Sequence, residues 1–279
     1  MFYVPYKFRQ QTEYCTPKGP DISWAPWVRF SINDTNISLK VPRHSTKSSM
    51  MPRNPRRNYT LDAYHFSNHR SSKDGWLGCP LSTRGWDFNG SWFIGTRASL
   101  HMYANIITPS EANESLSFFH PRAFESGIAD FMTYLYGEET SEKDGSQDWF
   151  APMDWQPLTG HPCIAVQFDA IENVKVAGNR TDRYLFFPLS DHHLLQIVFG
   201  IARNKVWIGS NPSPEPDTSK WIDNTPMEKL ASDIINTLQI TMSPGAKQQQ
   251  EKALAGTMDA SLVKDFPPIK WNKAANKIG

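Results

Sequence analysis

Asp191, His192 and His193 form the polar triplet in this chain that is best suited to acid–base or metal chemistry. Histidine titrates near neutral pH and is a frequent metal ligand. The triplet separates two apolar runs, Tyr184–Leu189 and Leu194–Ile201, at the point where a β-hairpin needs a turn. Adjacent side chains on a strand point to opposite faces, so the two histidines are poorly placed to share one metal ion. We therefore interpret the triplet as a turn and predict neither a metal nor a cofactor.

Catalysis by other side chains has weak support in the sequence. A metal site would need ligands from distant histidines, and their spacing matches no common metal-binding motif. No Gly-x-Ser-x-Gly elbow, Walker loop or Gly-x-Gly-x-x-Gly after a strand occurs, which counts against the common hydrolases, nucleotidases and dehydrogenases. The distant histidines are His65, His69, His101 and His161.

The three cysteines, Cys15, Cys79 and Cys163, are odd in number and widely spaced. This pattern supports neither a disulfide framework nor a zinc site, and it favours a reducing, cytoplasmic setting. Cys163 begins an apolar strand and is expected in the core. Cys79 lies in a predicted loop and is the better candidate for a nucleophile, although the sequence places no base beside it.

The segment Pro42–Asn58 is locally basic and contains no acidic residue. A guanidinium fork matches a carboxylate or a phosphate. The segment lacks the interleaved aromatic residues that would stack on bases, so an acidic protein is a better candidate partner than nucleic acid. A solvated loop without a partner is the competing interpretation. The basic residues are Arg43, Lys47, Arg53, Arg56 and Arg57.

Several tryptophans also fall in predicted loops. Tryptophan, tyrosine and arginine are enriched where protein interfaces bind most strongly. We expect most of these indoles to pack at the rim of the core, and we retain Trp76 and Trp86 as candidates for a binding surface. The others are Trp149, Trp155 and Trp221.

Composition limits the fold and the class of partner. The 279 residues are 39% hydrophobic and 13% aromatic, enough for a large core, and the net charge of +1 gives no field that would attract nucleic acid or a membrane. No apolar run reaches the length of a transmembrane helix, and the first residues do not resemble a signal peptide. We predict an extended arm over 1–26, a single α+β domain over 27–242, and a polar helix with a tail over 243–279; the oligomeric state stays open.

The apolar pattern predicts a mostly antiparallel sheet with amphipathic helices packed on it. Hairpins are expected at Trp27–Val41, turning at Asn33, and at Tyr184–Ile201, whereas 67–89 and 149–162 are expected to be connections. Further predicted strands are Tyr59–Phe66, Ser91–Ile107 and Cys163–Ala170, and the predicted helices are Pro121–Gly137 and Pro226–Ile240, the second with a capping box of Thr225 and Glu228.

Part of this pattern resembles the PsbP-like fold, an α/β/α sandwich of small noncatalytic accessory and binding proteins. The hairpin RYLFFPLSDHHLLQIVFGIA and the helix MEKLASDIINTLQI carry the resemblance, with WVRFSI and ISLKVP as opening strands. The resemblance covers about half of the chain and implies no chemistry, because one fold can host unrelated functions.

These features favour a noncatalytic protein that binds another protein, and the resemblance implies an accessory or toxin-neutralising role. Two alternatives stay open: an enzyme of unfamiliar type with a His/Asp site near the central hairpin, and a carrier of lipid or another small ligand. The candidate binding residues are Arg43, Arg53, Arg56, Arg57, Trp76, Trp86, Asp191 and His192.

Overall fold

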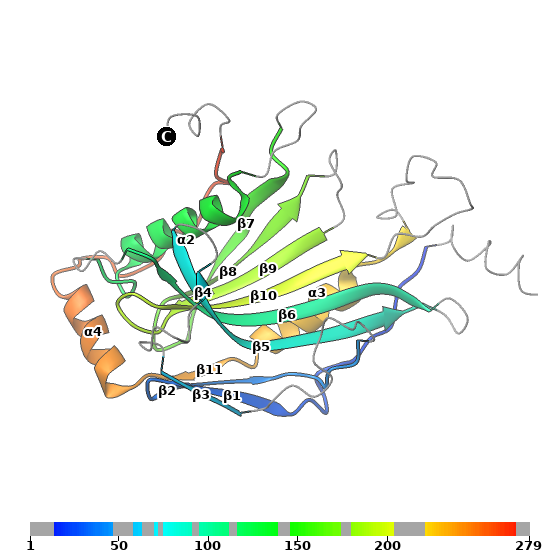
Figure 1. The fold of residues 1–279 in the computed structure, drawn as a ribbon, viewed down its shortest axis with the longest axis horizontal. Helices are drawn as coiled ribbons and strands as arrows, with labels where there is room; N and C mark the ends of the chain where they lie inside the picture. Colours follow the sequence, from blue (N-terminus) through cyan, green and yellow to red (C-terminus); the bar gives the residue numbers. More distant parts are fainter. Residues whose placement is uncertain are drawn as a thin grey trace, which may run out of the picture.

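The computed structural model is a mixed α+β fold with two mostly antiparallel sheets, which confirms the α+β, mostly antiparallel part of the predicted fold class (Figure 1). It describes residues 14–46, 58–62, 70–71, 75–90, 95–111, 116–138, 146–173, 180–203 and 221–271. The larger sheet has seven strands in the order β4-β5-β6-β10-β9-β8-β7, all paired antiparallel. These strands are β4 (Arg70–Ser71), β5 (Trp76–Asn89), β6 (Thr96–Pro109), β7 (Trp149–Leu158), β8 (Ala165–Glu172), β9 (Arg180–Pro188) and β10 (Leu194–Arg203).

The predicted central hairpin is confirmed as β9 and β10, and β10 is the middle strand of the seven. The parts of both strands next to the turn, Tyr184–Pro188 and Leu194–Ile201, are wholly buried because both faces of the sheet are covered there. Such strands are typically rich in branched and aromatic residues. The pattern that the sequence shows at this hairpin therefore reflects its position at the centre of the fold.

The smaller sheet has four strands in the order β11-β2-β1-β3. The first hairpin is confirmed: β1 and β2 pair antiparallel, and Asn33 and Asp34 turn between them with φ of 47° and 64°. Asn and Asp tolerate this left-handed region better than most residues. β3 then pairs parallel to β1. The bounds are β1 (Trp27–Ile32), β2 (Thr35–Lys40), β3 (Asn58–Leu61) and β11 (Gln239–Thr241).

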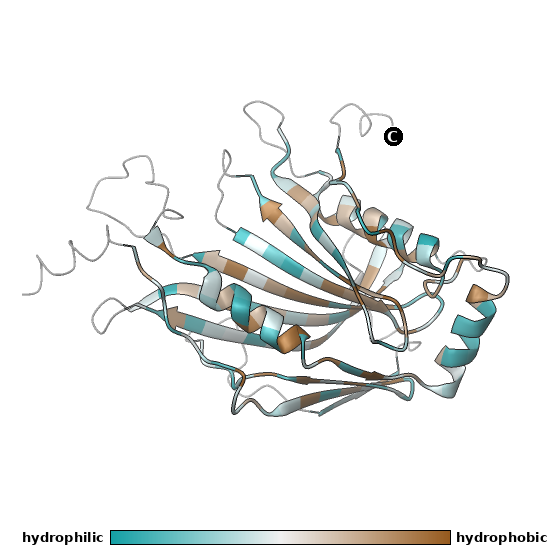
Figure 2. Cartoon of the chain, turned by 180° about the vertical axis from the view of Figure 1, so that it is seen from behind, coloured by the Kyte–Doolittle hydropathy of each residue, from teal (hydrophilic) through white to brown (hydrophobic). Residues whose placement is uncertain are grey.

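Helices and the small sheet cover the two faces of the large sheet differently. Helix α2 (Pro121–Tyr136) lies on one face, as predicted, and buries Phe124, Ile128 and Phe131 against it. Helix α3 (Thr225–Ile235) and the four-stranded sheet lie side by side on the other face (Figure 2). The arrangement therefore has a helix on one side of the central sheet and a second sheet with a helix on the other.

Two predicted connections are strands in the structure. β5 occupies most of the predicted loop 67–89, and β7 occupies most of the predicted connection 149–162. Prolines obscured β7, but β7 is the edge strand of the sheet, where a missing backbone donor is tolerated. A bulge between Pro80 and Ser82 obscured β5, because it breaks the alternation of inward and outward residues.

The second predicted helix is correct at its start and too long at its end. α3 ends at Ile235, and the chain turns tightly before β11, which pairs with β2. The predicted capping box is wrong. The N-cap residue is Asn224, and the backbone N–H of Thr225 donates to the Asp223 carboxylate instead.

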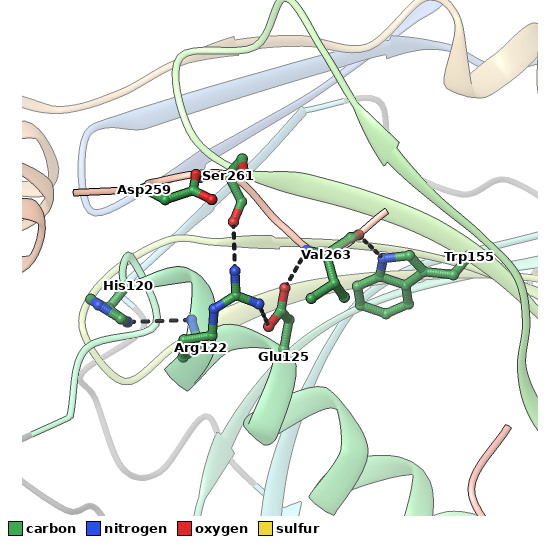
Figure 3. A network of polar contacts seen from close by, with 7 residues as sticks. All are labelled: His120, Arg122, Glu125, Trp155, Asp259, Ser261 and Val263. Atoms are coloured by element: carbon green, nitrogen blue, oxygen red, sulfur yellow. Dashed lines mark hydrogen bonds and ion pairs between the residues drawn. The ribbon is translucent and has the colours of Figure 1, made fainter. Parts of the chain in front are cut away.

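The described part of the chain ends in helix α4 (Pro244–Leu254) and an extended stretch over 255–271, which we call the C-terminal segment. The C-terminal segment runs along α2 (Figure 1) and is held there by backbone and side-chain hydrogen bonds (Figure 3). Glu125 of α2 accepts from the backbone N–H of Val263 at 2.6 Å, and Trp155 of β7 donates to the carbonyl of Val263 at 2.9 Å. The Trp271 indole is buried and donates to Thr133 of α2. No helix in the described part of the chain is long and apolar enough to cross a lipid bilayer.

Candidate functional site

The arginines of the basic segment are only partly visible. Arg53, Arg56 and Arg57 lie outside the described residues. Arg43 is exposed, and its backbone carbonyl accepts a hydrogen bond of 3.1 Å from the Trp86 indole. The described start of the basic segment is therefore fixed against β5.

Trp76 and Trp86 belong to the core. Both lie on β5, with exposed fractions of 2% and 0%, and they face opposite sides of the sheet because the bulge lies between them. The Trp76 indole donates to Asp130 of α2 at 2.9 Å. Neither ring forms part of the molecular surface, because the predicted loop that would have exposed them is a strand.

Asp191 and His192 lie in the turn of the central hairpin, as the sequence predicts. Ser190 organises this turn: its hydroxyl accepts from the backbone N–H of His192 and of His193 and lies 2.8 Å from His193 Nδ1. These hydrogen bonds give the Ser190 hydroxyl the role of a turn cap. The turn is covered as well, because Gln249 of α4 accepts from the backbone N–H of Asp191 at 3.1 Å.

A different set of polar side chains comes together on the face of the large sheet that carries α2. Strand register places three rows of residues on this face across β5, β6, β10 and β9. The first row is Thr83, Tyr103, Val198 and Tyr184; the second is Gly85, His101, Gly200 and Asp182; the third is Asp87, Ser99, Ala202 and Arg180. We call these three rows the polar face.

The end of α2 forms the border of the polar face. The hydroxyls of Tyr136, the last residue of α2, and Tyr184 hydrogen-bond to each other, and Tyr136 also donates to Asp182 at 3.4 Å. Asp182 in turn pairs with Arg180 Nε at 2.9 Å. Arg180 also lies over the Trp149 ring, 5.6 Å from its centroid. These contacts connect the buried Tyr136 and Asp182 to the half-exposed guanidinium of Arg180.

Burial shapes the protonation of the border residues. Burial raises the pKa of Asp182, and the guanidinium of Arg180 opposes that rise. Burial would lower the pKa of Arg180, but the charge and hydrogen bond of Asp182 raise it overall. The pKa of Tyr136 lies well above its ordinary value, chiefly through burial. Arg180 is therefore a permanent cation, and the tyrosine is a neutral donor.

His101 and Tyr103 are the central side chains of the polar face. Their rings stack loosely, with centroids 6.5 Å apart, and Tyr103 is 38% exposed. Burial is the main cause that lowers the pKa of His101; Arg180 and His44 add to the effect, and Asp87 opposes it. His101 is consequently a neutral imidazole at neutral pH, able to donate and accept one hydrogen bond.

Two glycines and the start of the basic segment complete the polar face. A Cβ at Gly200 would lie 3.2 Å from the Asp182 carboxylate, so this glycine makes room for the ion pair. A Cβ at Gly85 would lie 2.8 Å from Cγ2 of Thr46, so this glycine lets Thr46 pack against β5. The Thr46 hydroxyl donates to Asp87 at 2.9 Å. The backbone N–H groups of Ser45 and Thr46 donate to the carbonyl of Gly85. The basic segment thus begins along the rim of the polar face.

Sequence reasoning identified His101 only as a distant metal ligand and did not find the rest of the polar face. Within the described residues, no group of three or more His, Cys, Asp or Glu side chains is placed to hold a metal ion. A local signal existed: His101 and Tyr103 alternate with the apolar Leu100, Met102 and Ala104, which marks them as one face of a strand. The alignment with β5 and β9 depends on strand register and has no local signal.

Searches with the chain against protein-family models, curated proteins and solved structures find no match. The geometry of the polar face is therefore the basis for a functional proposal.

Proposed function

We propose that this chain is a noncatalytic binding protein that recognises an acidic protein partner through the polar face. The observation that carries the proposal is the placement of Arg180, His101 and Tyr103 on adjacent rows of one rigid sheet. Tyrosine and arginine are the residue types that contribute most at protein interfaces. Asp182 engages Arg180 through Nε, and the Arg180 side chain remains 53% exposed, so it can still meet a carboxylate.

The side chains of the polar face are held before a partner arrives. Asp182 and the Trp149 ring fix Arg180, and Tyr103 stands on a central strand beside His101. Ordering a free arginine on binding costs conformational entropy, and an arginine that is already ordered avoids most of that cost. This arrangement supports a surface built for recognition.

The basic segment extends the same surface. Its described residues Pro42–Thr46 run along β5 at the rim of the polar face, and Arg43 is exposed there. In our proposal Arg53, Arg56 and Arg57, which lie outside the described residues, contribute positive charge that speeds the approach of an acidic partner. A cytoplasmic location, a PsbP-like relationship and an accessory or toxin-neutralising role fit this proposal and stay predictions.

The test compares two exposed aromatic residues on different strands. Tyr103→Ala removes the centre of the polar face, and Phe150→Ala removes a side chain of matched exposure, 38% against 39%, from edge strand β7. Extract from cells that express the protein is passed over wild type and both variants, and bound proteins are quantified by mass spectrometry at low and high salt.

We expect an acidic protein that binds wild type and Phe150→Ala, is lost at high salt, and binds Tyr103→Ala at least about tenfold more weakly. Equal capture by Tyr103→Ala, or no specific capture by wild type, would overturn the proposal. A variant with Arg53, Arg56 and Arg57 changed to Glu measures how much the basic segment contributes to binding of the partner.

A further inference from the structure

The guanidinium of Arg180 is held in two ways, and both depend on Tyr136. Asp182 accepts from Arg180 Nε at 2.9 Å, and the guanidinium lies over the Trp149 ring, 5.6 Å from its centroid. Tyr136 donates its hydroxyl to Asp182 at 3.4 Å, and its ring stacks on Trp149 with centroids 4.7 Å apart. A displaced Tyr136 would therefore loosen the ion pair and the cation–π contact together.

Tyr136 occupies a position in α2 that is not stable by itself. It is the last residue of the helix, and helix ends open more readily than helix centres. Its side chain is nevertheless only 6% exposed. Trp149 stacks on one face of the ring, so other side chains must cover the rest.

The C-terminal segment, which runs along α2 (Figure 1), supplies this cover through Trp271. The buried Trp271 ring packs against Tyr136 with centroids 6.3 Å apart and planes tilted by 47°. Its indole N–H donates to Thr133 Oγ1 at 3.1 Å, and the Thr133 hydroxyl donates onward to the carbonyl of Ala129. Trp271 therefore contacts the last turn of α2 at two points.

The backbone just before Trp271 is fixed to the sheet. Ile269 donates its backbone N–H to the carbonyl of Ala151 on β7 at 2.9 Å, and its own carbonyl accepts from the Gln147 side chain at 3.3 Å. Trp271 is thus positioned from β7 as well as from α2. A continuous series of ring contacts leads from the C-terminal segment to the polar face. Its members, in order, are Trp271, Tyr136, Trp149 and Arg180.

We propose that Trp271 is a positioning residue for Arg180, so that the polar face binds its partner most tightly while the C-terminal segment is docked. This inference rests on the proposed function, in which Arg180 is the cation of the binding surface. Release of Trp271 frees the last turn of α2, and Tyr136 then loses its contacts with Asp182 and Trp149. A partner must then order the guanidinium on binding, which weakens the complex. By linkage, a bound partner holds the C-terminal segment more firmly in place.

The test follows the Nε–H group of Arg180 by NMR in the full chain, and the signal is assigned by its loss in Arg180→Lys. Exchange of this hydrogen with water requires the ion pair with Asp182 to open. We expect Trp271→Ala to speed this exchange at least about tenfold. The matched control is Phe266→Ala, which removes another ring of the C-terminal segment, one that packs on Trp155 with centroids 4.9 Å apart. The control should change the exchange rate by less than about twofold.

A second measurement uses wild type alone, so it holds even where Trp271→Ala folds poorly. Exchange of the Trp271 indole N–H is compared with that of Arg180 Nε–H as urea is raised below the unfolding transition. We expect both rates to rise together, because release of the indole loosens the ion pair. The proposal is overturned by an Arg180 hydrogen that stays protected after the indole hydrogen has exchanged. It is also overturned if folded Trp271→Ala exchanges at the rate of wild type or of Phe266→Ala.

Partner capture separates this proposal from the proposed function. Under the capture conditions used for Tyr103→Ala, we expect Trp271→Ala to bind the acidic partner at least about fivefold more weakly than Phe266→Ala does. Suppose that wild type captures a partner that Tyr103→Ala loses: equal capture by the Trp271 and Phe266 variants would then overturn the role of Trp271 and leave the proposed function intact. If wild type captures no partner while the Arg180 signal depends on Trp271, the proposed function is overturned and the positioning of Arg180 by Trp271 stands.

Discussion

One face of the seven-stranded sheet has a covered half and an open half. In the covered half, α2 and the C-terminal segment bury the stacked rings of Phe168 and Phe186. A few residues along the same strands, the open half presents Arg180, His101 and Tyr103 to solvent. The strands are continuous across both halves, so the difference comes from where α2 ends.

Buried polar residues at the end of α2 fix the position of an exposed side chain in the open half. Tyr136 ends α2 and joins Tyr184 and Asp182, which are polar yet buried, and their hydrogen bonds satisfy one another. Asp182 then positions Arg180 on the open side. The covered half therefore stabilises the fold, and its Asp182 also holds Arg180 in place in the open half.

The covered half should show the largest loss of stability on truncation. Phe186 has an exposed fraction of 0% and lies edge-on to Phe131 of α2, with ring centroids 5.9 Å apart. We expect Phe186→Ala to lower the free energy of unfolding by about 3–5 kcal/mol, because it leaves a cavity under α2. Urea denaturation measures the change, and a loss below about 1 kcal/mol would show that α2 does not close this half.

The contact between α2 and the C-terminal segment should matter less. Glu125 accepts from the backbone N–H of Val263 at 2.6 Å and pairs with Arg122, so Glu125→Ala leaves a buried donor unsatisfied. We expect Glu125→Ala to lower the free energy of unfolding by about 1–3 kcal/mol and to speed proteolysis within the C-terminal segment. The control is Asp233→Ala on α3, which breaks a pair with the exposed Lys229 and should change stability by at most about 0.5 kcal/mol. Equal effects of the two variants would contradict the role of Glu125.

Strand β5 shows why part of the large sheet was not predicted from the sequence. Before the bulge, Cys79 faces the core beneath the small sheet; after it, Trp86 and Phe88 do. The inward positions change from odd to even numbers, so no single period of two runs through the strand. Gly78, Pro80 and Gly85 strengthen the impression of a loop. The bulge is fixed by pairing with β6, which is distant information that a local pattern does not contain.

The elements that the sequence predicts well depend on local chemistry. The turn at Asn33 and the four-residue spacing from Phe124 to Ile128 are both set within one element. The open half is different, because its residues come from β5, β6 and β9 and meet only through register. Sequence analysis could place His101 on the polar side of a strand but could not give it Arg180 as a neighbour.

In the open half, the contribution of His101 to the free energy of unfolding should depend on pH. Burial lowers the pKa of His101, so below the ordinary value of 6.5 the unfolded chain takes up a proton that the folded chain resists. Stability from His101 is therefore present above that pH and is lost as the pH falls. We expect the difference in unfolding free energy between wild type and His101→Gln to shift in favour of the variant between pH 7.5 and 5. A difference that stays constant with pH would mean that His101 titrates as an exposed histidine does.

Tyr103 should give the smallest change in stability. It is 38% exposed on a central strand, and its ring contacts His101 without being buried beneath another element. We expect Tyr103→Ala to change the free energy of unfolding by less than about 1 kcal/mol, although the same truncation at Phe186 costs several times more. Thermal and urea denaturation of both variants under one set of conditions makes the comparison direct. If Tyr103→Ala destabilised the protein as much as Phe186→Ala, the Tyr103 ring would be buried in the core, and the binding surface would have to lie elsewhere. If it leaves stability unchanged, any loss of partner capture by Tyr103→Ala reports on recognition rather than on unfolding.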